Sequence, residues 1–177
     1  MGTADVLVRT ARPSDMHLLR DLRNHYVEHS NATFDETPLT DVEVQQWMQR
    51  FAPNGPHQLF VAEGAGSLLG FAGSQPYRLH PSFRATVETS VYCAPGTTGR
   101  GIGAALYAAL FSALSDQGLH RAVVGIALPN DASIRLHEKF RFVQVGVFDQ
   151  YAVKRGQYIS SVWMQRAMGD RKFCDKS

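Results

Sequence analysis

The stretch from Val87 to Leu110 reads VETSVYCAPGTTGRGIGAALYAAL and joins a strand pattern to a helix pattern through a glycine-rich turn. In its first part the residues alternate with a period of two, which predicts a strand with Glu88, Ser90 and Tyr92 on one face. Pro95 ends that strand because proline cannot donate to a sheet ladder. Leucines four residues apart follow the turn and indicate an amphipathic helix. The rest of the chain is organised around this strand, turn and helix.

Gly96, Gly99, Gly101 and Gly103 bring bare backbone to the start of the predicted helix. A helix amino terminus carries unpaired amide groups and a partial positive charge, and glycine lets a phosphate approach that backbone closely. Arg100 adds a full positive charge beside it. The turn therefore predicts an anion site, although the same glycines would also suit a tight connection between a strand and a helix.

Two nucleotide-binding patterns fit this turn poorly. The dinucleotide fingerprint needs a third glycine at its own spacing, and a P-loop needs Gly-Lys-Ser/Thr after its glycines. The segment from Thr98 to Gly103 instead resembles the acyl-CoA pyrophosphate loop of the GNAT N-acetyltransferase superfamily, Gln/Arg-x-x-Gly-x-Gly/Ala. Thr98 replaces the usual Gln or Arg, which leaves the backbone amides in place. The resemblance implies that acetyl-CoA is bound by the residues of this turn and helix start: Gly99, Arg100, Gly101, Ile102, Gly103 and Ala104.

Length and composition indicate one globular domain. A chain of 177 residues buries about two-thirds of its unfolded surface. The net charge of +2 is too small to argue for a nucleic-acid partner. Cys93 and Cys174 do not make a disulfide framework, and Cys93 is expected to be a buried, reduced thiol.

The amino terminus shows no apolar signal segment, and no stretch approaches the roughly 20 apolar residues of a membrane span. We therefore expect a cytoplasmic protein without membrane contact and without a bound metal. Its domain is predicted to cover residues 1–168, and residues 169–177 are predicted to form a flexible tail.

The remaining chain alternates strand and helix patterns. A capping box of Thr40 and Glu43 starts one helix, and Gly118 is predicted to cap the end of the helix that follows the glycine turn. The order of elements is β-α-α-β-β-β-α-β-α-β-β, which is also that of the GNAT superfamily. It predicts a single α/β domain with a central mixed sheet, antiparallel and parallel, flanked by helices on both faces. Strands besides the first stretch are expected at 6–9, 59–63, 68–74, 122–128, 142–148 and 159–165.

Three separated motifs narrow the resemblance to one branch of the superfamily. They are Asn24-His25-Tyr26, the VETSVY strand, and the segment LPNDASIRLHE that ends at Glu138. Together they resemble the phosphinothricin and methionine sulfoximine N-acetyltransferases, some of which confer herbicide resistance. The resemblance implies acetyl transfer to the amino group of a small amino acid analogue, by a homodimer. Arg141-Phe142 stands where the branch has Gly-Tyr or Gly-Phe, so we expect that helix end to be capped in another way.

The chemistry requires a neutral amine, so a general base is needed. Glu88 on a sheet covered from both sides would be partly desolvated, with a raised pKa that suits a base; the alternative is a solvent-facing glutamate. The resemblance implies that Glu88 is the base. His137 could accept the amine proton or hold the substrate, although a lone histidine is usually a satisfied core residue. Asn130 could bind the cofactor, cap the following helix, or do both.

The substrate is expected between two loops. Backbone groups from Val91 through Tyr92 to Cys93 would pair with pantetheine as an added strand, which places the acetyl group near Glu88. A carboxylate or phosphinate needs a cation, and Arg78 and Arg84 are stronger candidates than His80. The resistance enzymes carry arginine beside the loop Phe and in the later loop, whereas this chain has Asp35 and His80. The predicted substrate-binding residues are Phe34, Arg78, His80, Phe83, Arg84 and Tyr92.

Other functions remain open from the residues alone. Asp35 could attract a polyamine or another small cationic amine. An acetyltransferase for peptide amino termini would need an open groove instead of two closing loops. A regulatory module that binds acetyl-CoA without catalysis would not depend on Glu88.

Overall fold

The structure is a computed structural model that describes residues 6–64 and 66–169. The predicted order of strands and helices is confirmed, with two short 3-10 turns, η1 (Pro13–Asp15) and η2 (Pro81–Phe83), added to it. The helices are α1 (Met16–His29), α2 (Asp41–Met48), α3 (Ile102–Leu114) and α4 (Asp131–Lys139). The strands are β1 (Leu7–Thr10), β2 (Leu59–Gly64), β3 (Ser67–Pro76), β4 (Thr86–Cys93), β5 (Arg121–Ala127), β6 (Val143–Lys154) and β7 (Gln157–Ala167).

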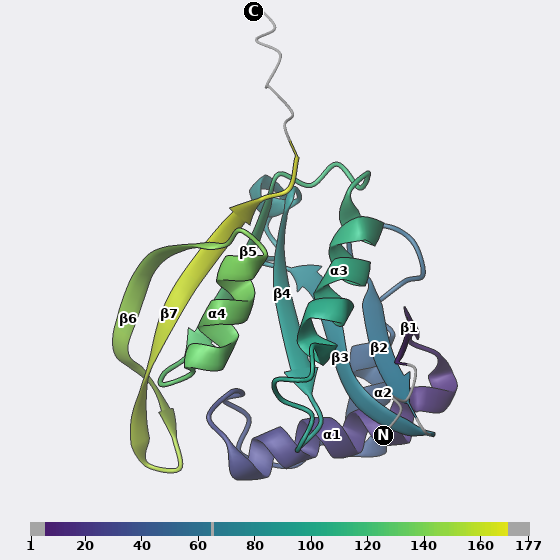
Figure 1. Cartoon of the computed structure of the whole chain (residues 1–177). Coiled ribbons are helices and arrows are strands. Elements are labelled where there is room, and N and C mark those ends of the chain that lie inside the picture. Colours follow the sequence, from purple (N-terminus) through teal and green to yellow (C-terminus); the bar gives the residue numbers. More distant parts are fainter. Residues whose placement is uncertain (1–5, 65, 170–177) are drawn as a thin grey trace, which may run out of the picture.

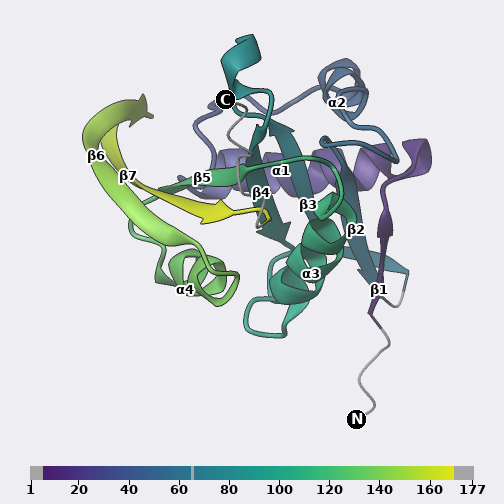
Figure 2. The same ribbon diagram turned by 90° about the horizontal axis from the view of Figure 1, so that it is seen from above.

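The seven strands form one sheet in the order β1-β2-β3-β4-β5-β7-β6. β4 and β5 are parallel, and every other neighbouring pair is antiparallel. Helices α1 and α2 lie on one face of the sheet and α3 and α4 on the other, as Figures 1 and 2 show. The predicted fold class, a mixed sheet with helices on both faces, is therefore confirmed.

The parallel pair is short, and this decides where the site lies. β4 and β5 pair only from Thr86 opposite Arg121 to Glu88 opposite Val123. Beyond that point the two strands diverge, as Figure 1 shows for β4 and β5. The last five residues of β4 therefore present an edge without a strand partner on the β5 side.

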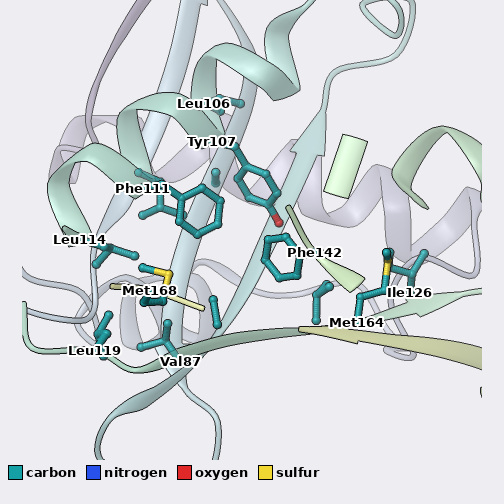
Figure 3. Packing of buried hydrophobic residues seen from close by; sticks show 14 of the residues in the cluster. Val87, Leu106, Tyr107, Phe111, Leu114, Leu119, Ile126, Phe142, Met164 and Met168 are labelled. Carbon is teal, nitrogen blue, oxygen red and sulfur yellow. The ribbon is translucent and has the colours of Figure 1, made fainter. Parts of the chain in front are cut away.

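Two apolar clusters cover the two faces of the sheet. The larger cluster packs α3 against the sheet through residues such as Leu106, Leu114 and Val87, together with Phe142, which lies just before β6 (Figure 3). The smaller cluster lies under α1 and α2 and includes Tyr92. Val87 and Tyr92 thus lie on opposite faces of β4, as the alternation predicts.

The largest differences from the predicted boundaries are at the ends of α3 and β6. Helix α3 ends at Leu114, because Ser115 occupies the C-cap and its hydroxyl donates to the Ser112 carbonyl at 2.9 Å. Gly118 follows in the loop, with φ +71°, instead of capping the helix. The strand predicted to end at residue 148 continues to Lys154, because a register shift and a positive φ at Gln150 absorb the polar residues in its middle.

Helix α4 ends with a residue in the left-handed conformation, which is usually a glycine. Arg141 has φ +65°, its amide donates to the Glu138 carbonyl at 2.8 Å, and the Phe142 amide donates to the His137 carbonyl at 3.0 Å. This pair of bonds is the Schellman motif. The expectation that this end is capped in another way was therefore wrong: Arg141 adopts the left-handed conformation that glycine usually takes there.

Met168 is buried and packs in the larger cluster. The predicted tail lies outside the described residues except for Gly169. Among residues 6–64 and 66–169, no helix has both the length and the apolarity to cross a membrane.

Candidate active site

A cavity of about 380 Å³ opens where β4 and β5 separate. Its walls come from these two strands, from α1 and the loop after it, from the start of α4, and from β7. The separation of the strands thus creates a pocket in the middle of the sheet. Six of the predicted site residues line it together: Phe34, Glu88, Val91, Tyr92, Asn130 and His137.

The Glu88 carboxylate is half-buried in the cavity wall at the last position where β4 pairs with β5. Within the described chain, no side chain or backbone group forms a hydrogen bond or ion pair with it. Desolvation by burial raises the pKa of this carboxyl above its usual value. A desolvated carboxylate without a partner is a proton acceptor of increased basicity, as general-base chemistry requires.

His137 is almost fully buried, with 1% of its surface exposed. Its Nδ1 lies 2.7 Å from the Ser133 carbonyl, which can only accept, so Nδ1 carries the proton. Nε2 then accepts from the Tyr107 hydroxyl at 2.8 Å. Burial lowers the pKa of His137, which keeps the ring neutral. Both ring nitrogens are thus engaged within the protein.

Asn130 is the N-cap of α4, because its Oδ1 accepts from the Ser133 amide at 3.2 Å. The cap uses the side-chain carbonyl and leaves the amide NH₂ group beside the cavity. Capping and ligand binding are therefore compatible at this residue.

The free edge of β4 is well defined. The Ala94 amide donates to the Leu69 carbonyl on β3 at 2.8 Å. Because bonded residues alternate along an antiparallel pair, the backbone groups of Val91 and Cys93 point away from β3 and into the gap. The Tyr26 hydroxyl already donates to the Cys93 carbonyl at 2.7 Å.

The Tyr92 side chain is fixed in the cavity wall. Its hydroxyl donates to the Ala32 carbonyl at 3.1 Å, and its ring stacks on Phe71. Burial raises the pKa of Tyr92 to about 12, so the phenol is neutral. It can contact a ligand through its ring but is held by the loop after α1.

The glycine turn lies past the end of β4 and leads into α3. Gly99 and Gly101 have φ of +80° and +81°, and Gly101 is the N-cap, so that the helix begins at Ile102. Arg100 between the glycines is exposed, and Ala104 lies in the first turn. A Cβ at Gly103 would lie 2.9 Å from the Leu136 side chain, so this glycine allows α3 and α4 to approach closely.

The remaining predicted substrate residues, Arg78, His80, Phe83 and Arg84, do not line the cavity. The Arg78 guanidinium lies over the Phe83 ring, His80 Nδ1 accepts from the Ser82 amide, and Arg84 donates to the Pro81 carbonyl. Their polar groups are thus engaged locally around η2.

The polar cavity residues that escaped the sequence reasoning include Arg23, Ser161 and Trp163. Ser161 Oγ and Trp163 Nε1 are buried without a hydrogen-bond partner among the described residues. Arg23 lies on the buried side of α1, close to Leu19 and Tyr26 in the helical pattern, and an arginine in that stripe was a usable signal. Ser161 and Trp163 on β7 gave no such sequence signal, because a serine and a tryptophan are ordinary residues in a strand.

The fold is that of an acyltransferase. The chain belongs to the acetyltransferase (GNAT) family, whose model matches residues 19–142, and it is an N-acetyltransferase by class.

Several of its relatives carry the names of the predicted branch. The chain is 47% identical to the phosphinothricin N-acetyltransferase of Streptomyces coelicolor, covering 94% of this chain and 99% of that protein. It is 34% identical to the L-methionine sulfoximine/L-methionine sulfone acetyltransferase of Pseudomonas aeruginosa, over 89% of this chain and 92% of that one. The solved structure of yncA from Salmonella typhimurium with its cofactor acetyl-CoA superimposes with a TM-score of 0.90 at 29% identity, covering 98% and 100% of the two chains.

Proposed function

We propose that this chain transfers the acetyl group of acetyl-CoA to the amino group of a small amino acid analogue, with Glu88 as the general base. The observation that carries the proposal is the unpartnered, half-buried Glu88 carboxylate at the point where β4 and β5 separate. Relatives named for phosphinothricin and for methionine sulfoximine support this substrate class.

The free edge of β4 supports acetyl-CoA as the donor. Val91 and Cys93 offer backbone donors and acceptors to an extended, amide-bearing chain such as pantetheine, and Asn130 lines the same cavity. The glycine turn offers the first amides of α3 to the phosphates. Acetyl-CoA supplies a thioester whose carbonyl carbon accepts an amine as the bond to sulfur breaks.

Glu88 then acts on the amine. Its carboxylate removes a proton from the amino group, directly or through one water, so that the nitrogen lone pair is available for attack. Burial raises the pKa of Glu88 and so moves its basicity toward the operating pH. His137 already bonds through both nitrogens, which supports a positioning role that joins α4 to α3 through Tyr107.

We further propose that the protein is a homodimer that uses β6. This strand lies at the edge of the sheet, and its apolar side chains are exposed along its whole length. Such an edge promotes association unless it is covered.

Sedimentation velocity of the wild type and of Val145→Glu, a substitution on β6, tests the proposed dimer. A dimer that becomes a monomer supports the proposal, and a monomeric wild type contradicts it. The exposed residues are Val143, Val145, Val147, Phe148, Tyr151 and Val153.

The proposed reaction is tested by the release of CoA thiol with phosphinothricin, methionine sulfoximine, methionine sulfone, spermidine and a short peptide. We expect turnover of the amino acid analogues. Glu88→Gln should lower kcat by about 10²- to 10⁴-fold, while Glu138→Gln, an exposed glutamate on α4, leaves it unchanged. Turnover of spermidine or the peptide alone contradicts the substrate class, and binding of acetyl-CoA without any turnover favours a regulatory module.

A further inference from the structure

Among the described residues that line the cavity, Arg23 is the only lysine or arginine. It lies on α1, its side chain is 21% exposed, and it lines the same cavity as Glu88. No hydrogen bond from its five N–H donors is formed within residues 6–64 and 66–169. Its nearest carboxylate is Asp35, at 3.7 Å between Nη2 and Oδ2, which is too long for a hydrogen bond.

An aromatic ring, and not a hydrogen bond, holds the Arg23 side chain in its position. The guanidinium carbon lies 4.4 Å from the centre of the Trp47 ring, and Trp47 is itself buried against Phe71. Stacking of this kind restrains the plane of a guanidinium and leaves its N–H edges unused. The Trp47 ring thus restrains the Arg23 guanidinium in the cavity wall, and its donors form no hydrogen bond within the described residues.

The cation and the base both lie near Tyr92 in the cavity wall. Tyr92 is close enough to Arg23 and to Glu88 for both charges to act on its hydroxyl, in opposite directions. Arg23, Tyr92 and Glu88 also share the cavity wall. A small molecule with an amine at Glu88 could therefore extend past the Tyr92 ring to Arg23.

We propose that Arg23 determines substrate specificity by binding an oxyanion group, a carboxylate or phosphinate, of the amine that is acetylated. This inference rests on the proposed function. The guanidinium offers the planar fork that matches two oxygens of such a group. Burial that removes water from Arg23 strengthens the attraction.

Asp35 sets the strength of this attraction. It is about half exposed, accepts from the Thr33 hydroxyl at 3.0 Å, and offsets part of the Arg23 charge. A substrate oxyanion would approach Arg23 against the repulsion of this carboxylate. Removing the Asp35 charge should therefore tighten the binding of anionic amines, the opposite of removing Arg23.

The test compares methionine sulfone with the corresponding amine that lacks the carboxylate, and with phosphinothricin. Arg23→Met keeps an apolar chain over Trp47, and Arg23→Lys keeps the charge without the fork; thermal melting establishes that both are folded. Arg135→Met is the matched control, because Arg135 is exposed on α4 and does not line the cavity.

We expect Arg23→Met to raise KM for methionine sulfone by about 10- to 100-fold, with kcat and the KM for acetyl-CoA nearly unchanged. Arg23→Lys should be intermediate, Asp35→Asn should lower KM, and the decarboxylated amine should respond to none of these changes. An effect on phosphinothricin alone assigns the phosphinate as the bound group. Equal effects on the decarboxylated amine, or none at all, would overturn the inference and leave the proposed function standing. A wild type that acetylates no amino acid analogue would overturn both.

Discussion

Nζ of Lys154, at the end of β6, lies 2.8 Å from the backbone carbonyl of Thr33, which is 121 residues earlier in the chain. The same ammonium donates to the Ser30 carbonyl at 2.6 Å and is almost fully buried. Phe34, which follows Thr33 in the chain, lines the cavity. Figure 1 shows the turn between β6 and β7 beside the end of α1. The β6–β7 hairpin thus holds the loop that forms one wall of the site.

Lys154→Met should therefore loosen this loop. The substitution leaves two carbonyls without their donor, which should lower the free energy of unfolding by about 1–3 kcal/mol. It should also raise KM for the amine while KM for acetyl-CoA stays unchanged, since the free edge of β4 is untouched. Urea denaturation and steady-state kinetics measure both effects. Lys139→Met, at an exposed position on α4, is the control; an equal rise in both KM values would contradict this account.

The raised pKa of Glu88 predicts the pH dependence of the reaction. Only the ionised carboxylate can accept a proton, so kcat/KM should fall as the pH falls through the pKa of Glu88. Because desolvation raises that pKa, the fall should occur above the ordinary value of 4.5 for glutamate. A pH profile measures this limb. If the proposal is wrong, the residual activity of Glu88→Gln will show the same limb.

The same shift affects stability with a definite sign. The folded protein binds the Glu88 proton more tightly than the unfolded chain, so this residue destabilises the fold as the pH rises through its two pKa values. The penalty is absent below the unfolded pKa and is fully present only above the raised folded pKa. Glu88→Gln should therefore melt at a higher temperature than the wild type at pH 7, with the difference shrinking in acid. A lower melting temperature at pH 7 would mean that Glu88 stabilises the fold by contacts.

The sequence predicted those parts of the site that depend on local pattern. Strand alternation placed Glu88 and Tyr92 on one face, and the turn chemistry placed Gly101 at the start of α3. Arg23 was missed because its importance arises from Trp47 and Asp35, which are distant in sequence and meet it only in the folded chain. Arg78 and its neighbours were predicted from residue type alone, and local stacking around η2 keeps them from the cavity wall. The continuation of β6 beyond residue 148 was missed because polar residues interrupt the alternating pattern of the strand.

The glycine turn should tolerate no side chain at its N-cap. Gly101 has φ +81°, and any residue with a Cβ adopts this left-handed conformation at a cost of about 1–2 kcal/mol. Gly101→Ala should therefore reduce the free energy of unfolding and, by displacing the first amides of α3, raise KM for acetyl-CoA. Gly146→Ala is the matched control, because a Cβ there would meet nothing within 4 Å and the backbone has no positive φ. An unchanged KM for acetyl-CoA in Gly101→Ala would argue against the turn as the phosphate site.

Arg141 offers a test in the stabilising direction. Its left-handed φ of +65° is unfavourable for arginine and ordinary for glycine, and its charge also lies near that of Arg166. Arg141→Gly should raise the free energy of unfolding by about 0.5–1 kcal/mol, after the greater freedom of glycine in the unfolded chain is subtracted. Arg135→Gly makes the same chemical change inside α4, at an exposed helical position, and should lower the free energy by about 1 kcal/mol. Equilibrium denaturation distinguishes the two signs, and a loss of stability in both variants would show that the Arg141 side chain contributes contacts that outweigh its backbone strain.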